Sequence, residues 1–222
     1  MSPIIIIFIP ILFFSVVLHE CAHGIAAYRC GDDTAKLMGR ITLNPIPHID
    51  LFGTIILPLI AIFSGIPLIA WAKPVPVNPL NFRKPRRDDI IVSSAGIFTN
   101  ILVAITAGLF LIIVANFYII PNKIRAGLTL FFLSVIIINL WLASFNLIPL
   151  PPLDGSHILA NILPYSASRT YRQIPPLMGM IILLLILYSG LLGHIFNIII
   201  RITFVFAGAV TPDSVFAELG KF

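Results

Sequence analysis

Charged residues are scarce in this chain. Only 10% of its 222 residues are Asp, Glu, Lys or Arg, compared with about 25% in soluble globular domains. Hydrophobic residues make up 59%, and the mean hydropathy is +1.05. A water-soluble core could not bury this much apolar surface, so the composition excludes a soluble enzyme and predicts a polytopic membrane protein.

Cysteine is scarcer still, because only Cys21 and Cys30 are present. If one helix joins them they lie about 13 Å apart, which is too far for a disulfide. The first apolar stretch has no basic region before it, so we do not expect a cleavable signal peptide. No segment is polar enough for a separate soluble domain, and we expect one membrane domain over residues 1–222. The chain has a net charge of +5, but Lys and Arg in a membrane protein mostly mark its cytoplasmic loops. We therefore expect no nucleic-acid partner.

Five long apolar segments are present. They cover residues 4–28, 51–72, 90–120, 126–149 and 175–208. Gly190 and Gly193 divide the last segment, which is too long for one simple span. These segments predict an all-α polytopic protein with about five to six membrane segments.

The first segment contains His19-Glu20-Cys21-Ala22-His23. Ionisable groups at membrane depth are costly and usually functional. Residues four apart share a helix face, so His19 and His23 can hold one zinc ion while Glu20 acts as general base on the zinc-bound water. A structural zinc site or a proton relay would use the same residues.

A catalytic zinc needs a third protein ligand. The candidates are His48, Asp50, Asp154, His157 and His194. Asp154 is the strongest of them, since prolines 149, 151 and 152 unwind the end of the fourth segment before it. His48 is the next best.

Counting membrane crossings tests whether Asp154 can reach the histidines. If all of the first four segments crossed, a hydrocarbon core of about 30 Å would separate Asp154 from His19 and His23. One segment must therefore return to its own side. Segment 51–72 is interrupted by Gly53, Pro58, Ser64-Gly65 and Pro67, which favours a re-entrant hairpin.

The distribution of basic residues favours the same arrangement. With a hairpin at 51–72, ten Lys and Arg residues lie on one side and two, Lys123 and Arg125, on the other. With a full crossing the division is seven against five. The positive-inside rule therefore predicts an external N-terminus and a zinc site nearer the cytoplasmic face.

Asn146 is a polar residue in an otherwise apolar run, two turns before Asp154. It could donate a hydrogen bond to the oxyanion of a tetrahedral intermediate. It could equally bond a carbonyl freed by Pro149 or Pro151.

Together, HECAH at 19–23 and FNLIPLPPLDG at 145–155 resemble the site-2 protease family of intramembrane zinc metalloproteases, in its compact prokaryotic form without PDZ or CBS domains. The resemblance implies one zinc ion held by His19, His23 and Asp154, with Glu20 as base and Asn146 at the oxyanion. Gly96-Ile-Phe-Thr-Asn100 resembles a third family element, although Ile97 replaces its usual proline.

The sequence thus predicts a zinc endopeptidase of the cell membrane that cuts other proteins within or next to their transmembrane segments. Such a substrate must be partly unwound, and residues 37–72 could hold it through a short β element near the active site. The alternative is a metal-binding membrane transporter or sensor without proteolysis. The sequence predicts no particular substrate, regulator or oligomeric state.

Overall fold

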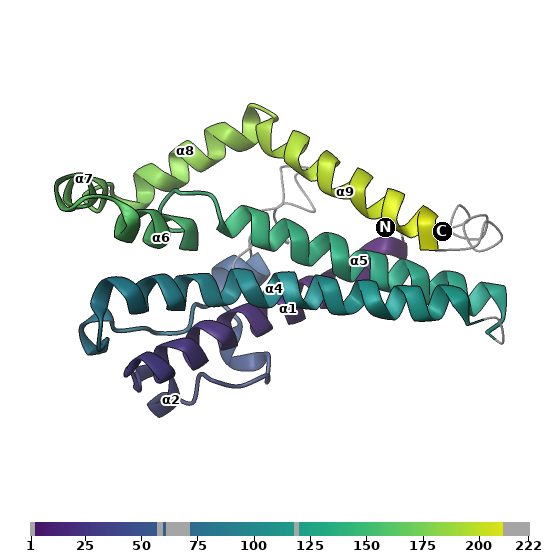
Figure 1. The fold of residues 1–222 in the computed structure, drawn as a ribbon, viewed down its shortest axis with the longest axis horizontal. Helices are drawn as coiled ribbons and strands as arrows, with labels where there is room; N and C mark the ends of the chain where they lie inside the picture. The colour runs from purple at the N-terminus through teal and green to yellow at the C-terminus, as the bar shows by residue number, and fades with distance from the viewer. Residues whose placement is uncertain (1–2, 57–59, 61–71, 118–119, 211–222) are drawn as a thin grey trace. The chain divides into compact units, whose positions relative to one another are not determined.

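The computed structural model describes residues 3–56, 60, 72–117 and 120–210. The described part is helical and contains no strand, so the predicted all-α class is confirmed. Figure 1 labels its helices, which are α1 (Pro3–Cys30), α2 (Thr34–Leu37), α4 (Pro85–Asn116), α5 (Asn122–Asn146), α6 (Asp154–Ile162), α7 (Tyr165–Tyr171), α8 (Pro176–Tyr188) and α9 (Leu191–Val210). Short helical turns lie at Ile46–His48, Leu51–Ile56 and Pro79–Asn81.

Four of these helices are long and apolar enough to cross a membrane. They are Ile7–Cys30, Pro85–Asn116, Asn122–Asn146 and Leu191–Ala209. Helices α7 and α8 would form a fifth span if counted together, but they meet at an angle of 81°. The molecule is therefore a multi-pass membrane protein, with four or five of the five to six predicted segments visible in the described residues.

The chain divides into two compact units. The first contains Met1–Leu12 and Ile97–Phe222. Its core is built from small and branched side chains on α4, α5 and α9: Ala104, Ala107, Leu111, Leu133, Ile136 and Ala207. The alanines allow the helices to approach closely, and α5 and α9 run side by side in Figure 1.

Within this unit the last apolar segment breaks where glycine was expected to break it. Helix α8 ends at Tyr188 and α9 begins at Leu191, with Gly190 between them at a φ of 78°. Glycine has no Cβ to oppose this left-handed conformation. Gly193 lies inside α9 and interrupts nothing.

The second unit is Phe13–Gly96. Its core joins the end of α1 to the start of α4 through Ala27, Cys30, Phe82 and Val92. Both cysteines are buried and unpaired with each other, as their spacing predicted.

The two ends of segment 51–72 lie together in this unit. The backbone N–H of Lys73 donates to the carbonyl of His48 over 2.9 Å. The segment thus leaves and returns at one place, as a re-entrant hairpin requires. Its course through residues 57–59 and 61–71 lies outside the described residues.

The short β element expected in residues 37–72 is absent from the described part of that range, and the residues that follow it, 73–78, form no strand either. Residues 72–78 are not helical, yet their N–H groups take separate partners rather than those of a neighbouring strand. Lys73 donates to His48, Val75 to the Glu20 side chain and Asn78 to the Asp32 side chain. The expected edge strand is therefore not formed in the described part of residues 37–72, and residues 57–59 and 61–71 of that range lie outside the described residues.

Candidate metal centre

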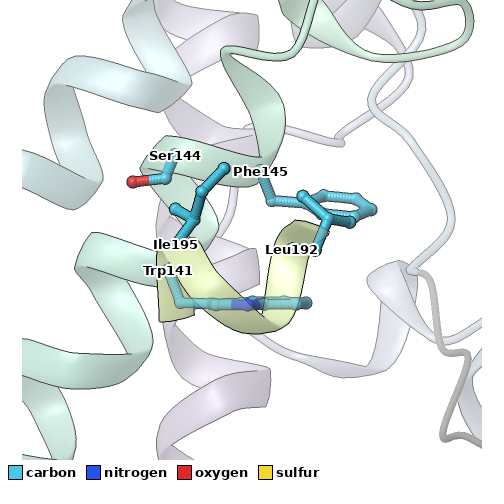
Figure 2. A pocket seen from close by; sticks show the side chains of 5 residues that line it. All are labelled: Trp141, Ser144, Phe145, Leu192 and Ile195. Atoms are coloured by element: carbon cyan, nitrogen blue, oxygen red, sulfur yellow. The ribbon is translucent and has the colours of Figure 1, made fainter. Parts of the chain in front are cut away.

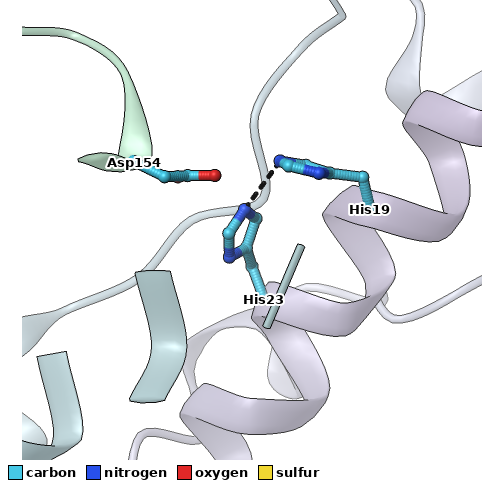
Figure 3. Close-up of side chains that lie close together, drawn as sticks. All are labelled: His19, His23 and Asp154. Carbon is cyan, nitrogen blue, oxygen red and sulfur yellow. Dashed lines mark hydrogen bonds between the residues drawn. The ribbon is translucent and has the colours of Figure 1, made fainter. Parts of the chain in front are cut away.

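His19 and His23 lie one turn apart on α1 and face the same way (Figure 3). Both are nearly buried, at 6% and 8% exposure. Their rings meet edge to face, with centroids 4.6 Å apart, and their Nε2 atoms are 3.0 Å apart. Two imidazole nitrogens this close in an apolar helix form a site suited to a cation.

The tautomer of His23 is fixed by the main chain. Its Nδ1 lies 2.7 Å from the carbonyl oxygen of Val92 on α4, which can only accept a hydrogen bond. Nδ1 therefore carries the proton, and the lone pair of Nε2 points toward His19. Metal-binding histidines are usually held in this way by a carbonyl or carboxylate behind the ring.

The donor set fits zinc. Tetrahedral zinc binds histidine nitrogen at about 2.0–2.1 Å, which separates two such ligands by roughly 3.3–3.4 Å. The observed 3.0 Å needs only a small opening of the pair.

Gly96 on α4 leaves room for the imidazole ring of His19. A Cβ at this position would lie 2.4–2.6 Å from three atoms of the imidazole. Any side chain would therefore push the ring away, so glycine is required by the close approach of the ring to the α4 backbone.

Glu20 is half-buried beside the two histidines. Its Oε2 accepts a hydrogen bond of 2.7 Å from the backbone N–H of Val75. The non-helical segment 72–78 thus orients the carboxylate. Cys21, the next residue, is buried and donates its thiol to the Thr42 carbonyl, consistent with a packing role.

Asp154 is the first residue of α6 and belongs to the other compact unit (drawn in Figure 3). Two glycines fix the backbone around it. A Cβ on Gly155 would lie 2.3 Å from the Leu147 carbonyl oxygen, and one on Gly179 would lie 1.9 Å from that of Pro151. Only glycine at these positions allows the proline-rich turn to pack against α6 and α8.

Asn146 is the last residue of α5 and is half-buried. Its side-chain amide donates a hydrogen bond of 3.0 Å to the carbonyl of Leu142, which lies in the same helix. The carbonyl it bonds is therefore not one freed by Pro149 or Pro151. A side-chain amide has two N–H groups, so this bond occupies only one of its donors.

The other candidates for the third ligand have different surroundings. His48 is fully buried, and its Nε2 bonds the Thr42 carbonyl, which holds the turn before segment 51–72. Asp50 accepts the N–H of Gly53. His194 is exposed and bonds the carbonyl of Gly190, which precedes α9, and His157 is exposed on α6.

A small hollow near the end of α5 carries no titratable group (Figure 2). It is lined by Trp141, Ser144, Phe145, Leu192 and Ile195. Trp141 and Phe145 stack there with centroids 5.1 Å apart. The hollow is a packing feature between α5 and α9 and offers no chemistry.

Two contributors to the site were missed in the sequence. The Val92 carbonyl orients His23, and the Val75 N–H orients Glu20. Both are backbone groups, which every residue carries, so no side-chain pattern could identify them.

Comparison with known proteins agrees with this geometry. The model of peptidase family M50 matches residues 7–124 and 114–188. YwhC of Bacillus subtilis is 45% identical over 155 residues, which cover 69% of this chain and 67% of YwhC. MJ0392 of Methanocaldococcus jannaschii is 30% identical over 204 residues, which cover 90% of this chain and 47% of MJ0392. The chain therefore spans about half the length of MJ0392. Rip2 of Mycolicibacterium smegmatis is 29% identical over 199 residues, 87% of this chain and 71% of Rip2. All three are named as zinc metalloproteases. No solved structure matches the chain.

Proposed function

Because this chain belongs to peptidase family M50, the site-2 protease family, we propose that it hydrolyses peptide bonds within or next to the transmembrane segments of other membrane proteins. That it is a membrane-embedded zinc metalloprotease follows from the family and from its apolar helices. The roles of individual residues, the class of substrate and the side of the membrane on which it acts are the content of the proposal.

The observation that carries the proposal is the arrangement on α1. Two buried imidazoles bring their Nε2 atoms within 3.0 Å, and the carboxylate between them in sequence is held by a separate backbone N–H. A site built only to store a cation would not need a third ionisable group oriented beside it. A hydrolase needs a base at that place.

His19, His23 and Asp154 are the proposed zinc ligands. Asp154 is chosen because it is the first residue of α6, where Gly155 and Gly179 allow the proline-rich turn to pack closely against α6 and α8. A carboxylate also completes a common catalytic donor set with two histidines. Zinc held by these residues supplies a Lewis acid that acidifies water and polarises a carbonyl.

Glu20 does the proton transfer. It takes a proton from the attacking water as the oxygen bonds to the acyl carbon, and it later gives that proton to the nitrogen as the carbon–nitrogen bond breaks. One water is consumed, giving a carboxylic acid and an amine, and the acid's proton then passes to the amine to leave a carboxylate and an ammonium group. The Val75 N–H keeps the carboxylate in place through both transfers.

Asn146 is proposed as the donor to the oxyanion. Its bond to Leu142 fixes the amide plane and leaves a second N–H for a substrate oxygen. The positive-inside asymmetry supports an active site nearer the cytoplasmic face, where the substrate helix must be partly unwound to expose its carbonyls.

The test is Glu20→Gln. Glutamine keeps an oxygen that can accept from Val75 but cannot carry the proton, so the variant should retain zinc and lose cleavage of a membrane substrate by roughly 10²–10⁴-fold. Asp33→Asn is the matched control, because Asp33 is an exposed carboxylate of the loop after α1. Undiminished cleavage by Glu20→Gln would refute the mechanism, and metal-dependent transport without cleavage by the parent protein would favour a transporter.

A further inference from the structure

Two leucines are unusually exposed in the loops after α1 and before α4. Leu37 is 83% exposed and Leu80 is 92% exposed, the highest values among the large hydrophobic side chains of the described residues. Met38, next to Leu37, is 62% exposed. Both leucines lie in short helical turns of otherwise polar segments.

These turns are held rigidly by one buried carboxylate. Asp32 is fully buried and accepts hydrogen bonds from the N–H and hydroxyl of Thr34, the N–H of Asn78 and the side-chain amide of Asn81. Asp32 therefore joins the turn that carries Leu37 to the turn that carries Leu80. We call the two turns, residues 31–38 and 78–84, the interfacial platform.

Positive charge surrounds the interfacial platform. Its exposed cations, with those beside it on α1 and α4, are Arg29, Lys36, Arg83, Lys84, Arg86 and Arg87. Of the four aspartates in the same region, Asp32, Asp88 and Asp89 are buried and only Asp33 is exposed. The surface is therefore strongly cationic.

The interfacial platform begins where two membrane spans end. One span finishes at Cys30 and another starts at Pro85, and the Arg83 N–H donates to the Cys30 carbonyl to tie these ends together. Side chains at this level of a membrane protein lie among lipid headgroups. Cations there meet phosphates, and leucines reach the edge of the acyl chains.

We propose that the interfacial platform binds anionic phospholipid headgroups, with Leu37 and Leu80 inserted into the edge of the hydrocarbon and the surrounding Lys and Arg on the phosphates. Leu37, with Met38 beside it, and Leu80 are small apolar groups set among exposed cations, which suits insertion between lipids better than capture of a folded partner. Exposed juxtamembrane cations near an anionic leaflet are attracted in this way.

Lipid binding at the interfacial platform would affect the orientation of Glu20, the proposed general base. The segment 73–78 connects the two, because its Asn78 N–H donates to Asp32 and its Val75 N–H donates to Glu20. Fixing the interfacial platform on headgroups therefore fixes the donor that orients the carboxylate. We expect anionic lipid to raise the rate of cleavage.

The first experiment measures insertion. Leu80→Cys, labelled with an environment-sensitive fluorophore, is reconstituted into phosphatidylcholine vesicles with and without phosphatidylglycerol; the native cysteines are buried, and the labelled parent gives the background. The probe should report a more apolar setting with phosphatidylglycerol, and Lys84→Gln/Arg86→Gln/Arg87→Gln should abolish that difference. The control triple variant Lys123→Gln/Arg169→Gln/Arg201→Gln removes the same charge from exposed sites elsewhere and should preserve it. A Leu80 probe that stays in water in both lipids would overturn the proposal.

The second experiment measures cleavage in the same vesicles. Phosphatidylglycerol should increase the rate several-fold for the parent and the control triple variant, but not for the variant of residues 84, 86 and 87. If lipid has no effect and the charge changes impair only substrates with acidic segments beside the membrane, the surface binds substrate and the proposal is wrong. Insertion of Leu80 is measured without catalysis, so failure of the proposed protease function would leave this result standing.

Discussion

Gly96 lies against the ring of His19, a proposed zinc ligand. Its replacement by alanine would place a Cβ 2.4–2.6 Å from the imidazole, so the ring must move. We expect Gly96→Ala to weaken zinc binding by about 10–100-fold, the range for changes in residues that support metal ligands. Zinc content after dialysis against a graded chelator measures this.

The control for Gly96 lies on the same helix. At Gly108 a Cβ would meet only ordinary contacts with Phe206, at 3.7 Å or more. Gly108→Ala should therefore bind zinc as the parent does. Equal zinc affinity for both alanine variants would show that the ring does not depend on the space at Gly96.

At the level of single residues, the metal-binding motif could be predicted and its supports could not. His19, Glu20 and His23 stand out because ionisable side chains are rare in apolar helices. The Val92 carbonyl that orients His23 belongs to a residue 69 positions away. Such a contact depends on how α1 packs against α4, which local sequence does not encode.

The element that bears most directly on Glu20 is the non-helical segment 72–78. Val75→Pro removes the N–H that donates to the carboxylate, whereas Val75→Ala keeps it and removes only the side chain. A hydrogen bond to a charged group contributes about 1.5–3 kcal/mol, so the proline variant should cleave roughly 10–100-fold more slowly than the alanine variant. Both should retain zinc, and steady-state cleavage with metal analysis tests this. Similar rates for the two variants would remove the orienting role of this bond.

The turns joined by Asp32 should respond to pH. Burial alone would raise the pKa of Asp32, but hydrogen bonds from Thr34, Asn78 and Asn81 outweigh it and lower the pKa below the usual value. The carboxylate therefore stabilises these turns above the unfolded pKa of about 3.9, and this stabilisation is lost as pH falls through the lower folded pKa.

Hydrogen exchange of residues 78–84 measures this effect. Protection should be high near neutral pH in the parent and low in Asp32→Asn, and the difference should disappear in strong acid. Asp33→Asn should resemble the parent throughout. A pH-independent difference between Asp32→Asn and the parent would contradict the titration.

At the level of elements, helices were easier to predict than what lies between them. The apolar runs located α1, α4 and α5 because membrane spans need about 20 apolar residues. The β element expected in residues 37–72 is missing from the described part of that range. In the residues that follow this range, the N–H groups of Val75 and Asn78 donate to the side chains of Glu20 and Asp32, and that of Lys73 donates to the His48 carbonyl, so they are not available to a strand edge.

For the whole molecule, the decisive prediction is the side on which each loop lies. Asp154 can share zinc with His19 and His23 only if residues 29–50, 73–89 and 150–174 lie on one side of the membrane. The hydrogen bond from Lys73 to His48 already places two of these loops together. Single cysteines at Asp33, Lys84 and Arg169 should therefore react with an impermeant maleimide from the same side, and one at Lys123 only from the other. All four are exposed, and the native cysteines are buried, which keeps the background low. Reaction of Arg169→Cys from the side of Lys123→Cys would exclude Asp154 from the site and require another third ligand.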